Sequence, residues 1–330
     1  MSAYDLITVG RTGMDLFSEQ VGAPFEDIAS FSASVGGSPS NVAIGTARLG
    51  LKSAVLTGVG EDKVADFVRR YLSKEGVSTE FVLTKAGRTG LAVVGVQPPA
   101  SFPLTFYREN PADIHITVAD ALSLPLEPSL LFSGTALARG SCRDATLVAA
   151  ERASGRTYLD LDLRPDQWSD PRAYGANVRT LLSHINTVIG TEEESYACLV
   201  ENANTTASTA IQSLTEAQKK TLETHLSAYL STPGAPTTWV LKRGAAGVSI
   251  FTGGEVLNVP GFTVEVVNTV GAGDAFASGL MYAQLQSWDW TRSARFANAC
   301  GALVVSRHGC SSAMPSLQEV SSFLKAQDSQ

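Results

Sequence analysis

Residues 266–279 carry the side chains and the spacing best suited to chemistry, in the order VVNTVGAGDAFASG. The pattern predicts a strand that feeds a turn of small residues, and the turn opens a helix. Backbone N–H groups at a helix N-terminus attract anions, and Gly271, Ala272 and Gly273 let a phosphate approach that backbone closely. Asp274 falls in the first helical turn, where a carboxylate would repel a phosphate unless it took a proton from an attacking hydroxyl. The alternative is a glycine-rich turn in which Asp274 is only a partner of the helix dipole.

A second segment, Val35–Ala43, favours a ligand site over a plain turn. Its sequence, VGGSPSNVA, places two glycines directly before a predicted helix in which Ser38 serves as N-cap. Gly36 and Gly37 permit close approach of the backbone to a ligand, and Asn41 is placed to hydrogen-bond hydroxyl groups. Without a ligand, the same residues make an ordinary helix N-terminus preceded by a turn.

Together the two segments resemble the signatures of the ribokinase (PfkB) family of sugar kinases, an N-terminal GG…N motif and a C-terminal DTxGAGD motif. They occur in the family's order, and the likeness in layout extends over essentially the whole chain. The resemblance implies an α/β, ribokinase-like fold with a mostly parallel central sheet, helices on both faces and a small inserted β-sheet lid. It further implies one kinase domain over residues 1–330, with the lid formed from about residues 12–36 and 88–110.

The resemblance also implies roles for individual residues. Asp274 would be the catalytic base, and residues 271–273 before it would form the anion hole. The residues implied in sugar binding are Asp15, Gly36, Gly37 and Asn41. The residues implied in ATP binding are Lys242, Gly244, Gly247 and Asn298, of which the last matches a helix position near adenine in relatives. Each assignment has a structural alternative. It is a strand-edge carboxylate for Asp15, a strand-to-hairpin turn for Gly244 and Gly247, and a polar helix residue bonded to backbone for Asn298.

Two residues bear on metal ions. Glu193 aligns with the glutamate of the family's NxxE motif, which implies binding of Mg²⁺ through water, although Gly190 stands where the family has Asn. Consecutive glutamates would equally suit an acidic helix start. Asn268 stands where the DTxGAGD motif begins with Asp, so it is a candidate metal-side residue that keeps an oxygen and loses the charge. This departure puts the family's dependence on a monovalent cation such as K⁺ in question.

Two arginines bear on the charge of the acceptor. Arg108 ends a predicted strand, and Arg164 follows the carboxyl end of another, where open α/β sheets bind ligands. Arginine suits bidentate recognition of a carboxylate, and family members that act on sugar acids carry similar segments. The small-molecule substrate is therefore expected to be a sugar acid, of which 2-keto-3-deoxygluconate is one candidate, and the neutral sugar fructose is the alternative. Surface ion pairs at both arginines and a catalytically inactive sugar sensor also remain open.

Strand and helix patterns must position these residues. In the second half, predicted strands at 130–133, 157–163, 187–190 and 238–242 alternate with predicted helices at 143–153, 174–182, 192–200 and 215–230. That spacing predicts a parallel sheet with helices on both faces. Strand-like segments near 15–35 and 90–108 break the alternation and predict the small inserted sheet.

Composition further limits the classes of protein to which the chain can belong. The chain has 330 residues, of which 44% are hydrophobic and 17% charged, and a formal net charge of −7. The apolar content excludes a disordered chain, and no Lys/Arg-rich tract predicts a nucleic-acid partner. Neither a signal peptide nor a membrane-length apolar run is recognisable, so we expect a cytoplasmic protein without a membrane partner. Four cysteines without a CxxC pair are expected to be buried, reduced thiols. Pairing of lid strands in relatives implies a homodimer.

Overall fold

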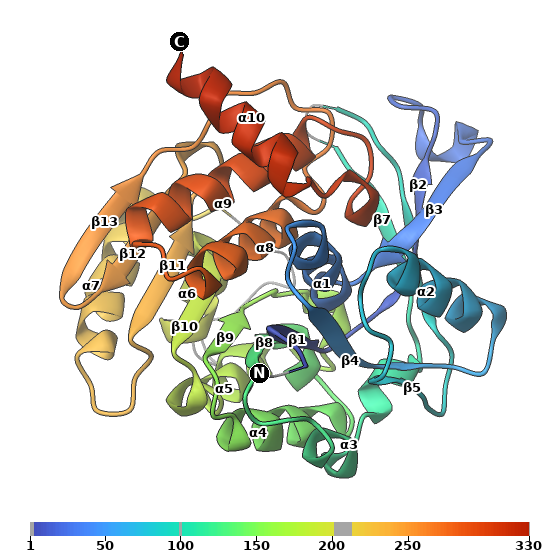
Figure 1. The fold of residues 1–330 in the computed structure, drawn as a ribbon, viewed down its shortest axis with the longest axis horizontal. Helices are drawn as coiled ribbons and strands as arrows, with labels where there is room; N and C mark the ends of the chain where they lie inside the picture. Colours follow the sequence, from blue (N-terminus) through green and yellow to red (C-terminus); the bar gives the residue numbers. More distant parts are fainter. Residues whose placement is uncertain (1–2, 99–100, 201–212, 330) are drawn as a thin grey trace. The chain divides into compact units, whose positions relative to one another are not determined.

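The computed structural model describes residues 3–98, 101–200 and 213–329 (Figure 1). The chain divides into two compact units. The first unit comprises Met1–His115 and Gly261–Gln330, and the second comprises Ile116–Pro260. Residues 99 and 100, inside the expected lid range, lie outside the described residues. In the described part of the chain, no helix has both the length and the apolar character needed to cross a membrane.

The first unit contains a set of parallel strands. β1 (Leu6–Val9) pairs with β4 (Ser53–Val59), and β4 pairs with the short β5 (Val82–Thr84), which the sequence analysis did not predict. Every residue of β1 and β4 is buried, as expected for strands covered on both faces. The unit's helices are α1 (Ser38–Arg48), α2 (Lys63–Lys74), α8 (Ala272–Leu285), α9 (Trp290–Val305) and α10 (Leu317–Asp328).

A separate four-stranded sheet, hereafter the lid sheet, belongs to the same unit. Its strand order is β3-β2-β6-β7, and its strands are β2 (Gly13–Ser18), β3 (Phe31–Gly36), β6 (Gly90–Val94) and β7 (Leu104–Tyr107). β2 pairs antiparallel with β3 and parallel with β6, and β6 pairs antiparallel with β7. These strands fall within the two segments from which the sequence predicted an inserted sheet.

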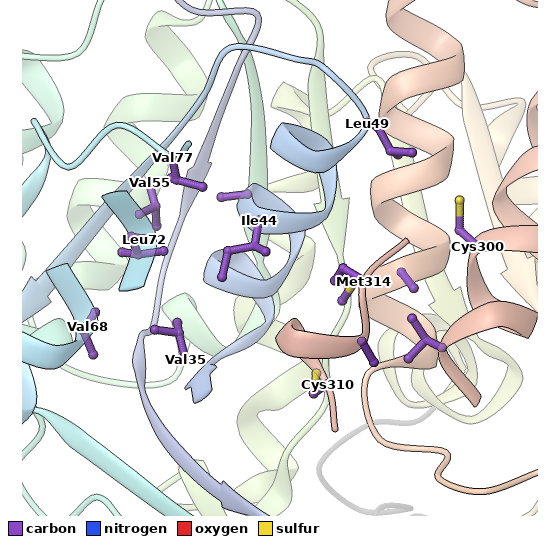
Figure 2. Packing of buried hydrophobic residues seen from close by; sticks show 14 of the residues in the cluster. Val35, Ile44, Leu49, Val55, Val68, Leu72, Val77, Cys300, Cys310 and Met314 are labelled. Atoms are coloured by element: carbon purple, nitrogen blue, oxygen red, sulfur yellow. The ribbon is translucent and has the colours of Figure 1, made fainter. Parts of the chain in front are cut away.

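One hydrophobic cluster fills the space between α1, α2, β4 and the C-terminal helices of the first unit. Figure 2 shows Val35, Ile44, Val55, Leu72 and Met314 in this cluster. The cluster joins segments from both ends of the chain, so the lid strand β3 and the helix α1 share their packing with the C-terminal helices. Cys142, Cys198, Cys300 and Cys310 are buried free cysteines.

Two local predictions for the first unit were wrong. Residues 266–270 form no strand, and the amides of Val267 and Asn268 both donate to the carbonyl of Val305 instead. The side chains of Val266, Val267 and Val270 are exposed or half-buried, so this segment does not pack as a buried strand would. Ser38 is not the N-cap of α1. Gly37 occupies that position with φ of 95°, a conformation that favours glycine.

The second unit carries a sheet in the order β13-β12-β11-β10-β9-β8. The strands are β8 (Ser129–Ser133), β9 (Thr157–Asp160), β10 (Thr187–Thr191), β11 (Thr238–Lys242), β12 (Val248–Thr252) and β13 (Glu255–Val259). β8 to β11 run parallel, and β11, β12 and β13 are antiparallel neighbours. The helices are α3 (Val118–Leu122), α4 (Cys142–Arg152), α5 (Tyr174–Arg179), α6 (Glu192–Leu199) and α7 (Glu216–Leu230). Apart from the short α3 and the antiparallel strands β12 and β13, these elements follow the predicted alternation.

Candidate active site

The two sequence motifs meet at a hydrogen bond between Asn41 and Asp274. Asp274 is the third residue of α8, after the N-cap Gly271, which adopts φ of 91°. Asn41 lies in the first turn of α1, and its Nδ2 donates to Asp274 Oδ2 at 2.7 Å. Asn41 Oδ1 is buried and accepts no hydrogen bond from the residues that the structure describes. Asn41 can therefore orient the Asp274 carboxylate while Oδ1 remains an acceptor.

Small residues allow α1 and α8 to come this close. A Cβ at Gly45 of α1 would overlap the hydroxyl of Ser278 on α8. Ser278 Oγ in turn donates to the carbonyl of Asp274 at 2.7 Å, one helical turn earlier. Neither Gly45 nor Ser278 was predicted as a site residue, yet their packing brings the two motif side chains within hydrogen-bond distance.

Cys310 lies beside the same pair, a position that the sequence analysis treated as structural only. Its Sγ accepts a hydrogen bond from Asn41 Nδ2 at 3.1 Å and lies 3.9 Å from Asp274 Oδ2. A Cβ at Gly271 would overlap this sulfur. Gly271 is therefore required both by its left-handed backbone and by the space that Cys310 occupies.

Asp15 projects from the central part of the lid sheet, on β2 opposite Ser34 of β3. A Cβ at Gly36 would overlap the Asp15 carboxylate, so the first glycine of the pair makes room for this side chain. Burial raises the pKa of Asp15 to about 6, and the nearby Asp274 carboxylate acts in the same direction, while Arg11 and Arg108 oppose the shift. The structure thus places Asp15 in electrostatic contact with the proposed base.

Arg108 is held at the end of β7 by residues of its own unit. Its guanidinium forms a buried ion pair with Asp113, with Nη2 2.8 Å from Oδ1, and Nη1 lies 3.4 Å from the carbonyl of Thr12. Asp113, which the sequence analysis missed, also accepts from the amide of Thr12 at 3.4 Å. These contacts hold the Arg108 guanidinium beside the lid sheet.

A pocket in the first unit is lined by four of the predicted sugar-binding residues together. Arg11, Asp15, Gly36, Gly37, Phe106 and Arg108 contribute to its wall. Gly37 must lack a side chain, because a Cβ there would lie 2.6 Å from the carbonyl oxygen of Arg11. Arg11, which lies two residues after the end of β1, was not predicted from the sequence as a site residue.

Asn268 is fully buried, and its amide holds the loop that precedes α8. Nδ2 donates to the carbonyl of Gly309 at 2.9 Å, and Oδ1 accepts from the amide of Val270 at 3.0 Å. These bonds join residues 268–270 to the segment that carries Cys310. A metal-side role of Asn268 stays a prediction, and the contacts assign it a structural role first. Asn298, the predicted adenine-side residue, lies half-buried on α9.

In the second unit, Lys242 ends β11 and pairs with Asp160 at the end of β9, with Nζ 3.2 Å from Oδ1. Gly244 and Gly247 then shape the turn into β12 with φ of 55° and 93°. The amide of Arg243 closes that turn by donating to the carbonyl of Gly247 at 2.8 Å. Lys242, Gly244 and Gly247 thus lie together at the end of β11, and their contact with ATP stays a prediction.

The three glutamates that open α6 have different partners. Glu192 pairs with Arg243 at 3.4 Å and Lys219 at 3.8 Å. Glu194 completes a capping box with Thr191 and accepts from the amide of Leu163 at 3.2 Å. The half-buried Glu193 makes no hydrogen bond or ion pair within the described ranges. Its carboxylate is thus the uncommitted one of the three, as a ligand for an ion or its water shell should be.

Arg164 lies just beyond β9, which ends at Asp160 rather than at Leu163 as predicted. The strand stops early because Asp162 adopts φ of 33°, a strained conformation for a residue with a side chain. Asp162 accepts from Ser133 Oγ at 3.0 Å and pairs with Arg164 Nε at 2.9 Å. The Arg164 side chain is 45% exposed, and its binding of a substrate carboxylate stays a prediction.

Comparison with known proteins identifies the class. The model of the pfkB family carbohydrate kinases matches residues 4–317, and this chain belongs to that family. A curated relative from Geobacillus thermodenitrificans (strain NG80-2), named 5-dehydro-2-deoxygluconokinase, is 31% identical over 334 residues, which cover 97% of this chain and 93% of the relative. The chain is therefore a carbohydrate kinase.

Solved structures agree on the fold. Fructokinase from Vibrio cholerae O395, crystallised with fructose, ADP and a calcium ion, is 25% identical with a TM-score of 0.80, over 98% of this chain and 100% of the other. A ribokinase II from E. coli, in complex with ATP and Mg²⁺, is 20% identical with a TM-score of 0.80, over 98% and 99% of the two chains. The predicted α/β, ribokinase-like fold class is confirmed.

Proposed function

We propose that this kinase transfers the γ-phosphoryl group of ATP to the terminal hydroxyl of 5-dehydro-2-deoxy-D-gluconate, giving the 6-phosphate. The observation that carries the proposal is the pocket of the first unit. It combines a carboxylate suited to hydroxyl groups, Asp15, with the guanidinium groups of Arg11 and Arg108, suited to an acid. The name of the G. thermodenitrificans relative supports the same acceptor, which would place the reaction in myo-inositol catabolism.

In the proposed reaction, Asp274 accepts the proton of the 6-hydroxyl as its oxygen attacks the γ-phosphorus. The new O–P bond forms while the bond from the γ-phosphorus to the β,γ-bridging oxygen breaks, and ADP leaves. Asn41 Nδ2 holds Asp274 Oδ2 at 2.7 Å, so the other carboxylate oxygen can face the acceptor. The amides of residues 271–273, at the start of α8, would stabilise the charge that develops on the transferred group.

Lys242, Gly244, Gly247 and Asn298 are proposed to bind ATP, and Arg164 is proposed to assist Arg108 with the acid. Lys242 is positioned by Asp160, and the two glycines leave the backbone of the turn accessible. An ATP complex of a protein with the same fold supports the cofactor. Use of ATP also underlies the expectation that the enzyme works in the cytoplasm.

Mg²⁺ fits the residues present. The ion usually binds one or two protein carboxylates, several waters and the substrate phosphates rather than a full protein cage. Glu193 offers a carboxylate without a committed partner, and no group of three His, Cys, Asp or Glu suited to a metal occurs in the residues of the described ranges. When bound, Mg²⁺ would neutralise phosphate charge, with Glu193 holding it through water. Asn268 already bonds two backbone groups, so its contribution would be to the loop.

Fructose is the second candidate acceptor, because the V. cholerae structure with fructose is 25% identical over 98% of this chain. Steady-state assays with ATP and a panel of acceptors separate the two: 5-dehydro-2-deoxygluconate, 2-keto-3-deoxygluconate and fructose. The highest kcat/KM for the first would support the proposal, and the highest value for fructose would refute it. Size-exclusion chromatography with light scattering tests the proposed homodimer, for which exposed Leu104 and Tyr107 of the edge strand β7 are candidate contacts.

A further inference from the structure

The pocket beside the lid sheet contains a second, buried arginine. Arg11 lies two residues after the end of β1 and is 8% exposed. Its guanidinium carbon lies 5.6 Å from the centroid of the Phe106 ring on β7, and both residues line the pocket with Asp15 and Arg108. Two cationic side chains therefore share one small cavity with one carboxylate.

The two arginines are held in different ways. Asp113 pairs with Arg108 at 2.8 Å and so offsets much of its charge. The Phe106 ring, whose centroid lies 5.6 Å from the Arg11 guanidinium carbon, attracts that guanidinium and helps to position it in the pocket. Arg11 and Arg108 both lower the pKa of Asp15, Arg11 more strongly, against the larger opposing effect of burial.

The diglycine explains why Arg11 is fixed at this point. The backbone of Gly37 passes so close that a Cβ would lie 2.6 Å from the Arg11 carbonyl oxygen and 3.1 Å from the Thr12 Cα. The start of α1 thereby packs on the backbone at Arg11. The same glycine pair that makes room for Asp15 also fixes the origin of the Arg11 side chain.

We propose that Arg11 is a specificity-determining residue that binds the carboxylate of the acceptor beside Arg108, while Asp15 binds its hydroxyl groups. The inference rests on the proposed function and names the contact that would select an acid. A planar guanidinium matches a carboxylate with two parallel hydrogen bonds, whereas a neutral CH₂OH group offers no such match. Arg11 contributes to recognition and leaves the proton transfer to Asp274.

The test is a cycle of two proteins and two ligands. Wild type and Arg11→Gln are compared with 5-dehydro-2-deoxygluconate and with its analogue in which CH₂OH replaces the carboxylate. A hydrogen bond to a charged group contributes about 1.5–3 kcal/mol, so kcat/KM for the acid should fall roughly 10- to 150-fold in the variant. The value for the neutral analogue should stay within about threefold. Arg70→Gln, an exposed arginine on α2, is the matched control and should change neither value.

A binding measurement keeps the inference separate from the proposed function. Competitive inhibition by gluconate and by glucitol probes the pocket whichever acceptor the enzyme phosphorylates. Failure of wild type to phosphorylate any sugar acid would refute the proposed function, while selective loss of gluconate inhibition in Arg11→Gln would still support the role of Arg11. Equal weakening of gluconate and glucitol would overturn the inference. Arg11→Lys keeps the charge but lacks the planar guanidinium. If the Gln variant misfolds, a selective loss of gluconate affinity in the Lys variant would support the inference, and unchanged affinity for gluconate would overturn it.

Discussion

Asn41 and Asp274 are 233 positions apart in the chain, yet Nδ2 of the first lies 2.7 Å from Oδ2 of the second. The hydrogen bond connects the first turns of α1 and α8, so the proposed base is held by the helix that begins at the diglycine. One carboxylate oxygen is thereby occupied, and the orientation of the other is set by the packing of two helices rather than by a mobile loop.

Replacement of the base should separate binding from catalysis. Asp274→Asn keeps the size and loses the proton acceptor, so kcat should fall about 10²–10⁴-fold, the usual contribution of general-base catalysis. The Kd values for ATP and acceptor, measured by calorimetry, should remain close to those of the wild type. A variant with most of its kcat intact would show that Asp274 is only a partner of the helix dipole.

Asp15 should make acceptor binding and stability respond to pH in opposite directions. Its pKa is raised to about 6 by burial, against about 3.9 in an unfolded chain. Below pH 6 the carboxylate takes up a proton and accepts hydroxyl protons less well, so kcat/KM for the acceptor should fall up to about tenfold per pH unit.

Between pH 4 and 6 the folded protein binds more protons at Asp15 than the unfolded chain does, so this group's contribution to stability should rise as the pH falls. Kinetic pH profiles and thermal unfolding from pH 5 to 8 measure the two effects. In Asp15→Asn, the decrease of kcat/KM at acidic pH should disappear. The contribution of Asp15 to the pH dependence of Tm should disappear as well. An unchanged decrease in that variant would assign the titration to another group.

Gly36→Ala should affect the acceptor and spare ATP. The added methyl would overlap the Asp15 carboxylate, which is the movable end of a side chain, so the carboxylate shifts while the backbone holds. We expect KM for the acceptor to rise about tenfold or more, with KM for ATP unchanged. Ser32→Ala, an exposed position on the same strand, serves as the control. Equal increases in both KM values would contradict this assignment.

The glutamates of α6 should separate metal binding from folding. Glu193→Gln should raise the Mg²⁺ concentration needed for half-maximal activity and leave Tm unchanged, because its carboxylate has no partner within the described residues. Glu194→Ala breaks the capping box with Thr191 and should lower stability by about 0.5–2 kcal/mol. Activity titrated with Mg²⁺ and thermal unfolding measure the two effects, and the reverse pattern would exchange the two roles.

Local sequence patterns predicted most of the elements, since buried apolar runs and helix caps are encoded within a few residues. Glycines before two helices also singled out Asp274 and Asn41 as candidate site residues, and the structure brings these two side chains together, while their roles stay predictions. Arg11, Asp113 and Cys310 were not predicted as candidate site residues, because only contacts between distant segments place them beside the predicted ones. The strand expected at 266–270 failed for a related reason. A β-branched run becomes a strand only where a neighbouring strand is available to pair with it.

The close contact of Gly45 with Ser278 has a consequence for amide hydrogen exchange. Helices that meet without intervening side chains share their contacts, so α1 and α8 should open together and only near global unfolding. The outer strands of the lid sheet carry exposed residues and can open locally at a lower free energy. Exchange measured by mass spectrometry should therefore protect peptides of both helices to the same late time, with the strands β3 and β7 exchanging earlier.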